Sequence, residues 1–68
     1  MAYIERISLK EARKKAGLKQ GYVSKVLGIS REYLYKIESG KQIPKVTLAY
    51  AMASLYGKHI DQLDFSCH

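Results

Sequence analysis

Long polar side chains dominate one short segment of the chain, from Arg31 to Ser39, whose only aliphatic residues are Leu34 and Ile37. In a helix, a turn of about 100° per residue would place these two aliphatic residues on one side. The donors and acceptors would then cover the opposite side. Such a face can hydrogen-bond to base edges in the major groove of DNA. It would carry Arg31, Glu32, Tyr35, Lys36 and Ser39.

Each of these side chains has a chemistry that suits DNA. Arg31 lies at the N-terminal end, which reaches furthest into the groove, and is suited to a bidentate contact with guanine. Lys36 could reach a guanine edge or a phosphate, while Glu32 could accept from cytosine N4 or hold Arg31 in place. Tyr35 and Tyr33 could touch thymine methyl groups or phosphates, but Tyr33 flanks the apolar side and could equally pack there. The alternative for the charged members is an ordinary solvated helix face.

The charge balance of the whole chain favours the same class of partner. The 68 residues carry a net charge of +6, with an isoelectric point near 9.6. A small basic domain most often meets nucleic acid, less often an anionic membrane or an acidic protein, and charge for solubility is the plainer alternative. The length allows one domain, residues 1–68, with a core over about 8–65.

The N-terminal sequence and the single cysteine favour a cytoplasmic location. Cys67 has no second cysteine to pair with, which favours a reducing environment. Glu5, Arg6 and Lys10 interrupt any apolar N-terminal run, so we expect no signal peptide. The longest apolar window, VTLAYAMASLY, is shorter than the roughly 18 residues of a membrane span. We therefore expect a soluble, cytoplasmic protein with no membrane partner.

Catalytic and metal chemistry find no support in the residue pattern. His59, Cys67 and His68 lack the paired ligand spacing of a zinc site. Asp61 and Asp64 are expected to serve as a helix cap and as surface residues. No Ser/His/Asp or Cys/His arrangement typical of catalysis stands out. We expect no enzyme, no metal, no cofactor and no small-molecule ligand, with Cys67 and His68 in a frayed tail.

Apolar residues recur with helical spacing throughout, and no segment alternates with period two as a strand would. Ser8, three residues before Glu11, predicts one helix start, and Ser30 predicts another. Glycines mark the helix ends. The predicted helices cover 8–17, 20–27, 30–40, about 46–56 and a last short turn in 60–65. The predicted fold class is therefore all-α, a compact five-helix bundle.

The same spacing predicts which side chains face the core. Some apolar residues near the C-terminus could instead face a partner, and two tyrosines of the fourth helix are expected at the core edge. The predicted core positions are Leu9, Ala12, Ala16, Leu48, Ala51, Met52 and Leu55, with Tyr50 and Tyr56 at the edge and Ile60, Leu63 and Phe65 facing the core or a partner.

Residues 20–39 have the pattern of a helix, a tight turn and a second helix. Gly28 suits the sharp turn because it reaches positive φ without the cost that other residues carry. Apolar residues at fixed offsets and a small Ser24 at the crossing complete the helix-turn-helix pattern. The agreeing positions are Val23, Ser24, Leu27, Gly28, Ile29, Leu34 and Ile37.

On the stretches LKEARKKAGLKQ, LGISREYLYKIESGKQIP and IDQLDF, the chain resembles the Cro/C1-type helix-turn-helix family of phage repressors and bacterial regulators. The resemblance covers about 9–65 and implies a lambda-repressor-like fold. It implies that Gln20 binds a phosphate and that Arg13 pairs with Glu38. It also implies base contacts by Arg31, Glu32 and Lys36 and a backbone-following loop that contains Lys41 and Lys45.

Two positions depart from the family pattern. Lys19 stands where a capping Ser, Thr or Asn is usual, and Gly21 should weaken its helix by roughly 0.5–1 kcal/mol. Lys19 also adds a cation where a phosphate is expected. The full set of predicted DNA-backbone contacts is Lys19, Gln20, Lys25, Ser30, Tyr33, Ser39, Lys41 and Lys45.

The function that follows is a sequence-specific double-stranded DNA-binding transcriptional regulator, a repressor that binds its operator as a dimer. Dimerisation would place two reading helices about 34 Å apart. A regulatory protein partner is a further expectation, because the chain has no room for a ligand-sensing domain. The dimer-contact candidates are Tyr56, Ile60, Leu63 and Phe65, for which closure of the core is the alternative.

Other functions remain open on the same scaffold. An adaptor or antitoxin that binds protein would lack cations on the groove face, whereas this chain has Arg31 and Lys36. A restriction-modification controller fits as well as a repressor, since the fold does not choose between them. A membrane-surface protein would need one long basic amphipathic helix, which the glycine-punctuated segments oppose. Stacking of single-stranded bases on the six tyrosines is weaker, because Tyr50 and Tyr56 are expected to pack.

Overall fold

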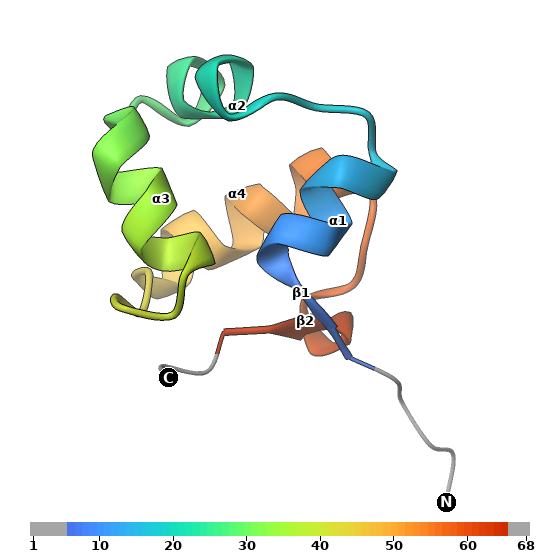
Figure 1. Cartoon of the computed structure of the whole chain (residues 1–68). Coiled ribbons are helices and arrows are strands. Elements are labelled where there is room, and N and C mark those ends of the chain that lie inside the picture. Colours follow the sequence, from blue (N-terminus) through green and yellow to red (C-terminus); the bar gives the residue numbers. More distant parts are fainter. Residues whose placement is uncertain (1–5, 66–68) are drawn as a thin grey trace, which may run out of the picture.

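The computed structural model describes residues 6–65, in which four helices surround one apolar core. Figure 1 shows α2 and α3 adjacent at one end of the molecule, α4 behind the centre, and two short strands below α1. The predicted tail residues Cys67 and His68 lie outside the described part. The elements are β1 (Ile7–Ser8), α1 (Leu9–Lys15), α2 (Gln20–Leu27), α3 (Arg31–Glu38), α4 (Val46–Tyr56), η1 (Ile60–Gln62) and β2 (Leu63–Asp64).

Serine side chains begin two of the helices as the sequence predicts. The Ser8 hydroxyl accepts a hydrogen bond from the Glu11 backbone N–H at 3.1 Å, which caps α1. The Ser30 hydroxyl accepts from the Tyr33 N–H at 3.0 Å and caps α3. Each satisfies a backbone donor that has no partner inside its helix. Lys19 begins α2 without a side-chain cap, in agreement with its predicted departure from the family pattern.

The turn between α2 and α3 depends on Gly28, whose φ of 70° and ψ of 31° are left-handed. Its N–H donates to the Lys25 carbonyl at 3.3 Å, and the N–H of Ile29 donates to the Ser24 carbonyl at 3.0 Å. These bonds close α2 and turn the chain directly into α3. Ser24 is 5% exposed at the crossing, as its small size predicts.

Most of the predicted core positions are buried or half-buried, but a few are exposed. Leu34, Met52 and Val23 are the largest fully buried side chains. Ala16 is exposed, and Arg13 is buried on α1 in its place. The core list is Leu9, Ala12, Val23, Leu34, Ile37, Met52, Ala53, Tyr56 and Leu63.

The inward face of α4 is rotated from the predicted one. Ala51 is exposed, whereas Ala49 and Ala53 are buried. Tyr56 is 5% exposed, but Tyr50 is 58% exposed and does not pack at the core edge. Because α4 is apolar almost all round, its spacing does not define one inward direction. None of the helices in residues 6–65 is long and apolar enough to cross a membrane.

The predicted fifth helix is wrong. Only Ile60–Gln62 form a turn of 3-10 helix, and Leu63–Asp64 continue as β2 in a parallel pair with β1. Leu63 lies opposite Ile7 and Asp64 opposite Ser8. The expectation that no strand forms is therefore also wrong, because two-residue strands are too short to show an alternating pattern. The predicted return of this segment to the core is correct, since Leu63 is 3% exposed.

Replacing Gly28 with alanine tests the turn. We expect Gly28→Ala to lower the free energy of unfolding by about 1–2 kcal/mol, because a Cβ is disfavoured in the left-handed region. Gly21→Ala is the matched control, since Gly21 lies inside α2 and is not among the glycines with positive φ. That change should raise stability by roughly 0.5–1 kcal/mol. Chemical denaturation followed by circular dichroism measures both, and equal effects of the two changes would contradict the assignment.

Candidate nucleic-acid interface

The outer face of α3 carries the residues predicted to contact bases. Arg31, Glu32, Tyr35 and Lys36 are all exposed, while Leu34 and Ile37 are 0% and 3% exposed beneath them. The Lys36 Nζ lies 3.7 Å from the Glu32 Oε1, in an ion pair between residues four apart. Glu32 is therefore paired with Lys36, and not with Arg31 as one alternative had it. The pair leaves both groups accessible, because the Lys36 side chain is 49% exposed and the Glu32 side chain 80% exposed.

The loop after α3 brings a further cation beside this face. The Lys41 Nζ lies 5.9 Å from the centre of the Tyr35 ring, in cation–π geometry. Its backbone N–H donates to the Lys36 carbonyl at 2.9 Å and so fastens the loop to the end of α3. Lys45 is exposed at the start of α4. The outer face of α3 is thus bordered by the Lys41 cation on its C-terminal side.

A nearly buried polar cluster fixes α3 to α1 and α2. The Arg13 Nε donates to the Glu38 Oε2 at 2.7 Å, and Nη2 donates to Oε1 at 3.3 Å. The Gln20 amide donates to the same Oε1 at 3.0 Å, and the Arg13 Nη1 donates to the Leu18 carbonyl at 2.9 Å. The Arg13 and Glu38 side chains are only 9% and 3% exposed. Glu38 is therefore occupied inside the protein and does not belong to the reading face.

Several predicted backbone-contact residues also have structural partners. The Ser30 hydroxyl caps α3, and the Ser39 hydroxyl donates to the Lys36 carbonyl at 3.3 Å. Tyr33 is half-buried against the core. Lys19 and Lys25 are exposed on α2 or at its start. The exposed Lys19 and Lys25 are therefore more accessible to a phosphate backbone than Ser30, Ser39 and Tyr33, which have partners within the protein.

Tyr56 lies near the Arg13–Glu38 pair and has a buried hydroxyl. Within residues 6–65 that hydroxyl has no hydrogen-bond partner. Burial, followed by the negative charge of Glu38, raises the pKa of Tyr56 from 10.0 to about 12, and Arg13 partly opposes the rise. The buried Tyr56 side chain therefore serves the core and is not available as a surface for a second subunit.

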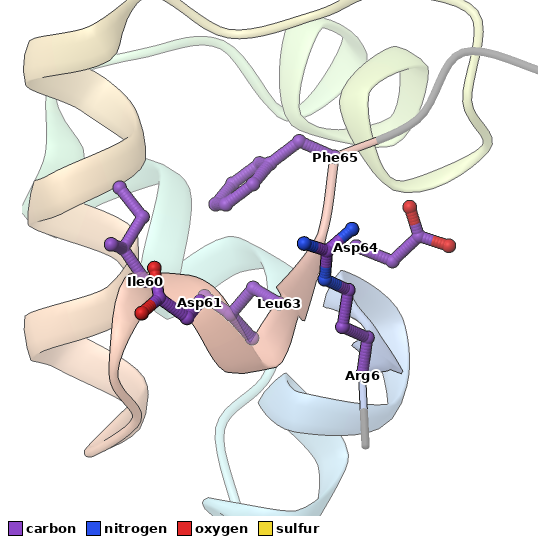
Figure 2. A pocket seen from close by; sticks show the side chains of 6 residues that line it. All are labelled: Arg6, Ile60, Asp61, Leu63, Asp64 and Phe65. Atoms are coloured by element: carbon purple, nitrogen blue, oxygen red, sulfur yellow. The ribbon is translucent and has the colours of Figure 1, made fainter. Parts of the chain in front are cut away.

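The predicted dimer contacts divide between the core and a surface hollow. Leu63, like Tyr56, is buried within the monomer. Ile60 and Phe65 are half-buried and line a hollow of about 300 Å³ together with Arg6, Asp61, Leu63 and Asp64. Figure 2 shows the Phe65 ring pointing towards Ile60, with the side chain of Arg6, the residue before β1, reaching up beside Asp64.

An exposed apolar strip lies on α4 and on the loop before α4, where the sequence predicts no binding surface. Ile43, Val46 and Tyr50 are 61%, 69% and 58% exposed. The signal in the sequence is the absence of any charged residue from Val46 to Tyr56, which indicates more apolar surface than one buried face needs. In the described part of the chain, no group of three or more His, Cys, Asp or Glu residues could hold a metal ion.

Comparison with known proteins identifies the family. A helix-turn-helix family model matches residues 9–63, which includes every helix described above. The chain belongs to the helix-turn-helix family. Members are non-enzymatic DNA-binding regulators of transcription, which agrees with the sequence prediction and excludes the enzyme class.

Two relatives support the assignment. Both are uncharacterized HTH-type transcriptional regulators from Archaeoglobus fulgidus, 34% and 33% identical to this chain over 58 residues. The alignments cover 85% of this chain and 83% and 82% of the relatives. No solved structure matches this helix-turn-helix chain significantly.

Breaking the buried pair should destabilise this helix-turn-helix domain. We expect Glu38→Gln to cost about 3 kcal/mol, because it leaves the Arg13 guanidinium nearly buried without an opposing charge. Glu32→Gln is the matched control and should cost less than about 1 kcal/mol, because its pair with Lys36 is exposed. Denaturant unfolding measures both. Similar losses for the two variants would mean that the buried pair does not hold α3 in place.

The Tyr56 hydroxyl predicts a loss of stability at high pH. Its pKa is raised to about 12 in the folded protein, so ionisation of this hydroxyl leaves stability unchanged below pH 10. Stability then falls as pH rises from 10 towards 12, because the unfolded chain ionises first. The difference of about two pH units corresponds to about 3 kcal/mol. Tyr56→Phe should abolish this part of the pH dependence and be neutral or stabilising at pH 7, since it removes an unpartnered hydroxyl. Unfolding of both proteins between pH 9 and 12 tests it, and parallel curves would contradict the assignment.

Proposed function

We propose that this protein is a sequence-specific double-stranded DNA-binding repressor that places α3 in the major groove and binds its operator as a dimer. The observation that carries the proposal is the division of α3 into two faces. Leu34 and Ile37 fix one face in the core, and the other presents long charged side chains to solvent. A helix seated in this way can enter a groove without uncovering the core.

Discrimination between operators would come from four side chains of α3. Arg31 would bind guanine through O6 and N7, and Lys36 a neighbouring guanine edge or a phosphate. Glu32 would accept from cytosine N4, while Tyr35 would contact a thymine methyl group or a phosphate. A good bidentate contact contributes about 1–3 kcal/mol of discrimination. The Glu32–Lys36 pair is weak enough to open for DNA, because both groups are solvated.

Affinity would come from the phosphate backbone. Lys19, Lys25, Lys41 and Lys45 are exposed around the reading helix, and each phosphate they neutralise releases condensed counterions. Gln20, although tied to Glu38, lies at the start of α2, where a second amide proton and the uncapped backbone N–H groups can meet a phosphate. Binding should therefore weaken steeply as salt concentration rises.

The dimer would use the half-buried residues at the C-terminal hollow. Of the four predicted contacts, Ile60 and Phe65 keep exposed surface there, while Tyr56 and Leu63 support them from the core. Two copies joined in this way would present their α3 helices to half-sites about 34 Å apart. The exposed strip of Ile43, Val46 and Tyr50 offers a competing surface for a second copy or a regulatory protein.

A protein-binding adaptor or antitoxin on the same scaffold is the alternative. Such a protein would not need cations on the outer face of α3, and the structure leaves Arg31 and Lys36 exposed there with Lys41 alongside. These cations favour DNA as the partner. A restriction-modification controller would use the same groove contacts and differs only in the gene that it regulates.

Selection of bound genomic fragments at two salt concentrations tests the proposal. We expect the wild-type protein to recover a common sequence, and Arg31→Ala to lose preference at one base pair of each half-site. That loss should be about 10-fold or more, with a modest loss of overall affinity. Lys14→Ala is the control, because it removes an exposed cation of α1 that we place in no DNA contact.

The recovered sequences also test the finer statements. A palindrome with half-sites one helical turn apart supports the dimer, whereas a single asymmetric half-site contradicts it. Lower expression from a promoter carrying the site supports repression, and higher expression contradicts it. Equal binding of all fragments by wild-type protein and Arg31→Ala would leave only nonspecific attraction and remove the proposed function.

A further inference from the structure

Arg31 lies over the one glycine inside α2. A methyl group placed on Gly21 would lie 3.9 Å from both the Cζ and the Nε atoms of the Arg31 side chain. Gly21 belongs to the first turn of α2, and Arg31 is the first residue of α3. The base of the guanidinium group therefore borders the space that a side chain at position 21 would fill.

The backbone of Gly21 does not explain why glycine stands there. The positive-φ glycines are Gly17, Gly28, Gly40 and Gly57, so Gly21 has a helical conformation that any residue can adopt. Glycine is disfavoured inside a helix because it loses more conformational freedom on folding than alanine. Outside α2 itself, the nearest atoms that a side chain at position 21 would meet belong to Arg31.

The Arg31 side chain has little else to direct it. Among the side-chain hydrogen bonds and ion pairs of residues 6–65, none involves the Arg31 side chain, and its neighbour Glu32 pairs with Lys36. A flexible side chain that is free in solution must be ordered when it binds, which reduces affinity. The first turn of α2 borders the guanidinium on one side and so limits the directions open to it before DNA arrives.

We propose that Gly21 is a positioning residue for Arg31: by presenting no side chain, it lets the guanidinium lie against the first turn of α2 and so sets the direction from which Arg31 meets its base. This inference rests on the proposed function, in which Arg31 contacts DNA. Gly21 itself touches no base. A bulky residue at position 21 pushes the guanidinium off α2 and weakens the Arg31-dependent preference while leaving the other contacts intact.

The size of residue 21 is the variable to test. Alanine adds a methyl group at an ordinary contact distance of 3.9 Å, so Gly21→Ala should have a small effect. Isoleucine has two branches at Cβ and cannot turn both away from Arg31, since β-branched side chains have restricted χ1 in a helix. Gly21→Gln, with an unbranched side chain that favours helix, is the second bulky variant. Ser54→Ile places an isoleucine on an exposed position of α4 and is the control.

The experiment measures the affinity ratio between the selected operator and the same operator changed at the base pair that Arg31→Ala ceases to distinguish. We expect Gly21→Ile and Gly21→Gln to reduce this ratio by about 5- to 10-fold, as one misplaced base contact would. Nonspecific affinity should stay within about twofold, because the number of neutralised phosphates is unchanged. Ser54→Ile should keep the wild-type ratio. At a base pair that Arg31→Ala still distinguishes, a bulky residue 21 should leave the ratio at its wild-type value.

The outcomes separate this inference from the proposed function. If wild-type protein shows a ratio that depends on Arg31, but Gly21→Ile and Gly21→Gln retain or increase it, the positioning role is overturned and the DNA-reading function stands. If the bulky variants equally reduce the ratio at a base pair that Arg31→Ala still distinguishes, residue 21 acts through another group and the inference also fails. If the wild-type ratio itself does not depend on Arg31, the assignment of Arg31 as a base contact fails first. Circular dichroism melting of each variant establishes that the compared proteins are folded.

Discussion

The nearly buried ion pair between Arg13 and Glu38 is the interaction on which the geometry of the DNA-reading surface depends. It joins α1 to the last turn of α3, and the Gln20 amide ties the start of α2 to the same carboxylate. Removing either charge would leave the other in a poorly solvated site, so the pair strongly favours one arrangement of the three helices. In the function that we propose, this position of α3 relative to α2 lets the outer face of α3 meet a groove while α2 follows the phosphates.

The polar residues of α3 serve two different purposes that their chemistry alone does not distinguish. Glu32 and Glu38 have the same side chain, yet the first is 80% exposed and the second 3% exposed. Tyr33 packs on the core, whereas Tyr35 is 55% exposed beside Lys41. A small domain can combine a stable core and a long polar face in eight residues, because the helical repeat assigns alternate groups of residues to opposite sides.

Regions governed by local interactions were predicted well. The Ser8 and Ser30 caps and the left-handed Gly28 depend on residues within one turn of each other, so the sequence shows them directly. The C-terminal segment was predicted poorly, because Leu63–Asp64 form a strand only by pairing with Ile7–Ser8, more than 50 residues earlier. Likewise the family resemblance supplied the pairing of Arg13 with Glu38, which helical spacing alone did not support.

The sequence by itself determined that this chain forms a helix-turn-helix, where its four helices lie, and which face of α3 is polar, because caps, glycine turns and apolar spacing act over a few residues. Only the tertiary structure decided which side of the uncharged α4 is buried, that Tyr56 and Leu63 belong to the core, and that Arg31 lies against Gly21. These features depend on how elements pack on one another. A helix that is apolar all round has no preferred inward side until its neighbours provide one.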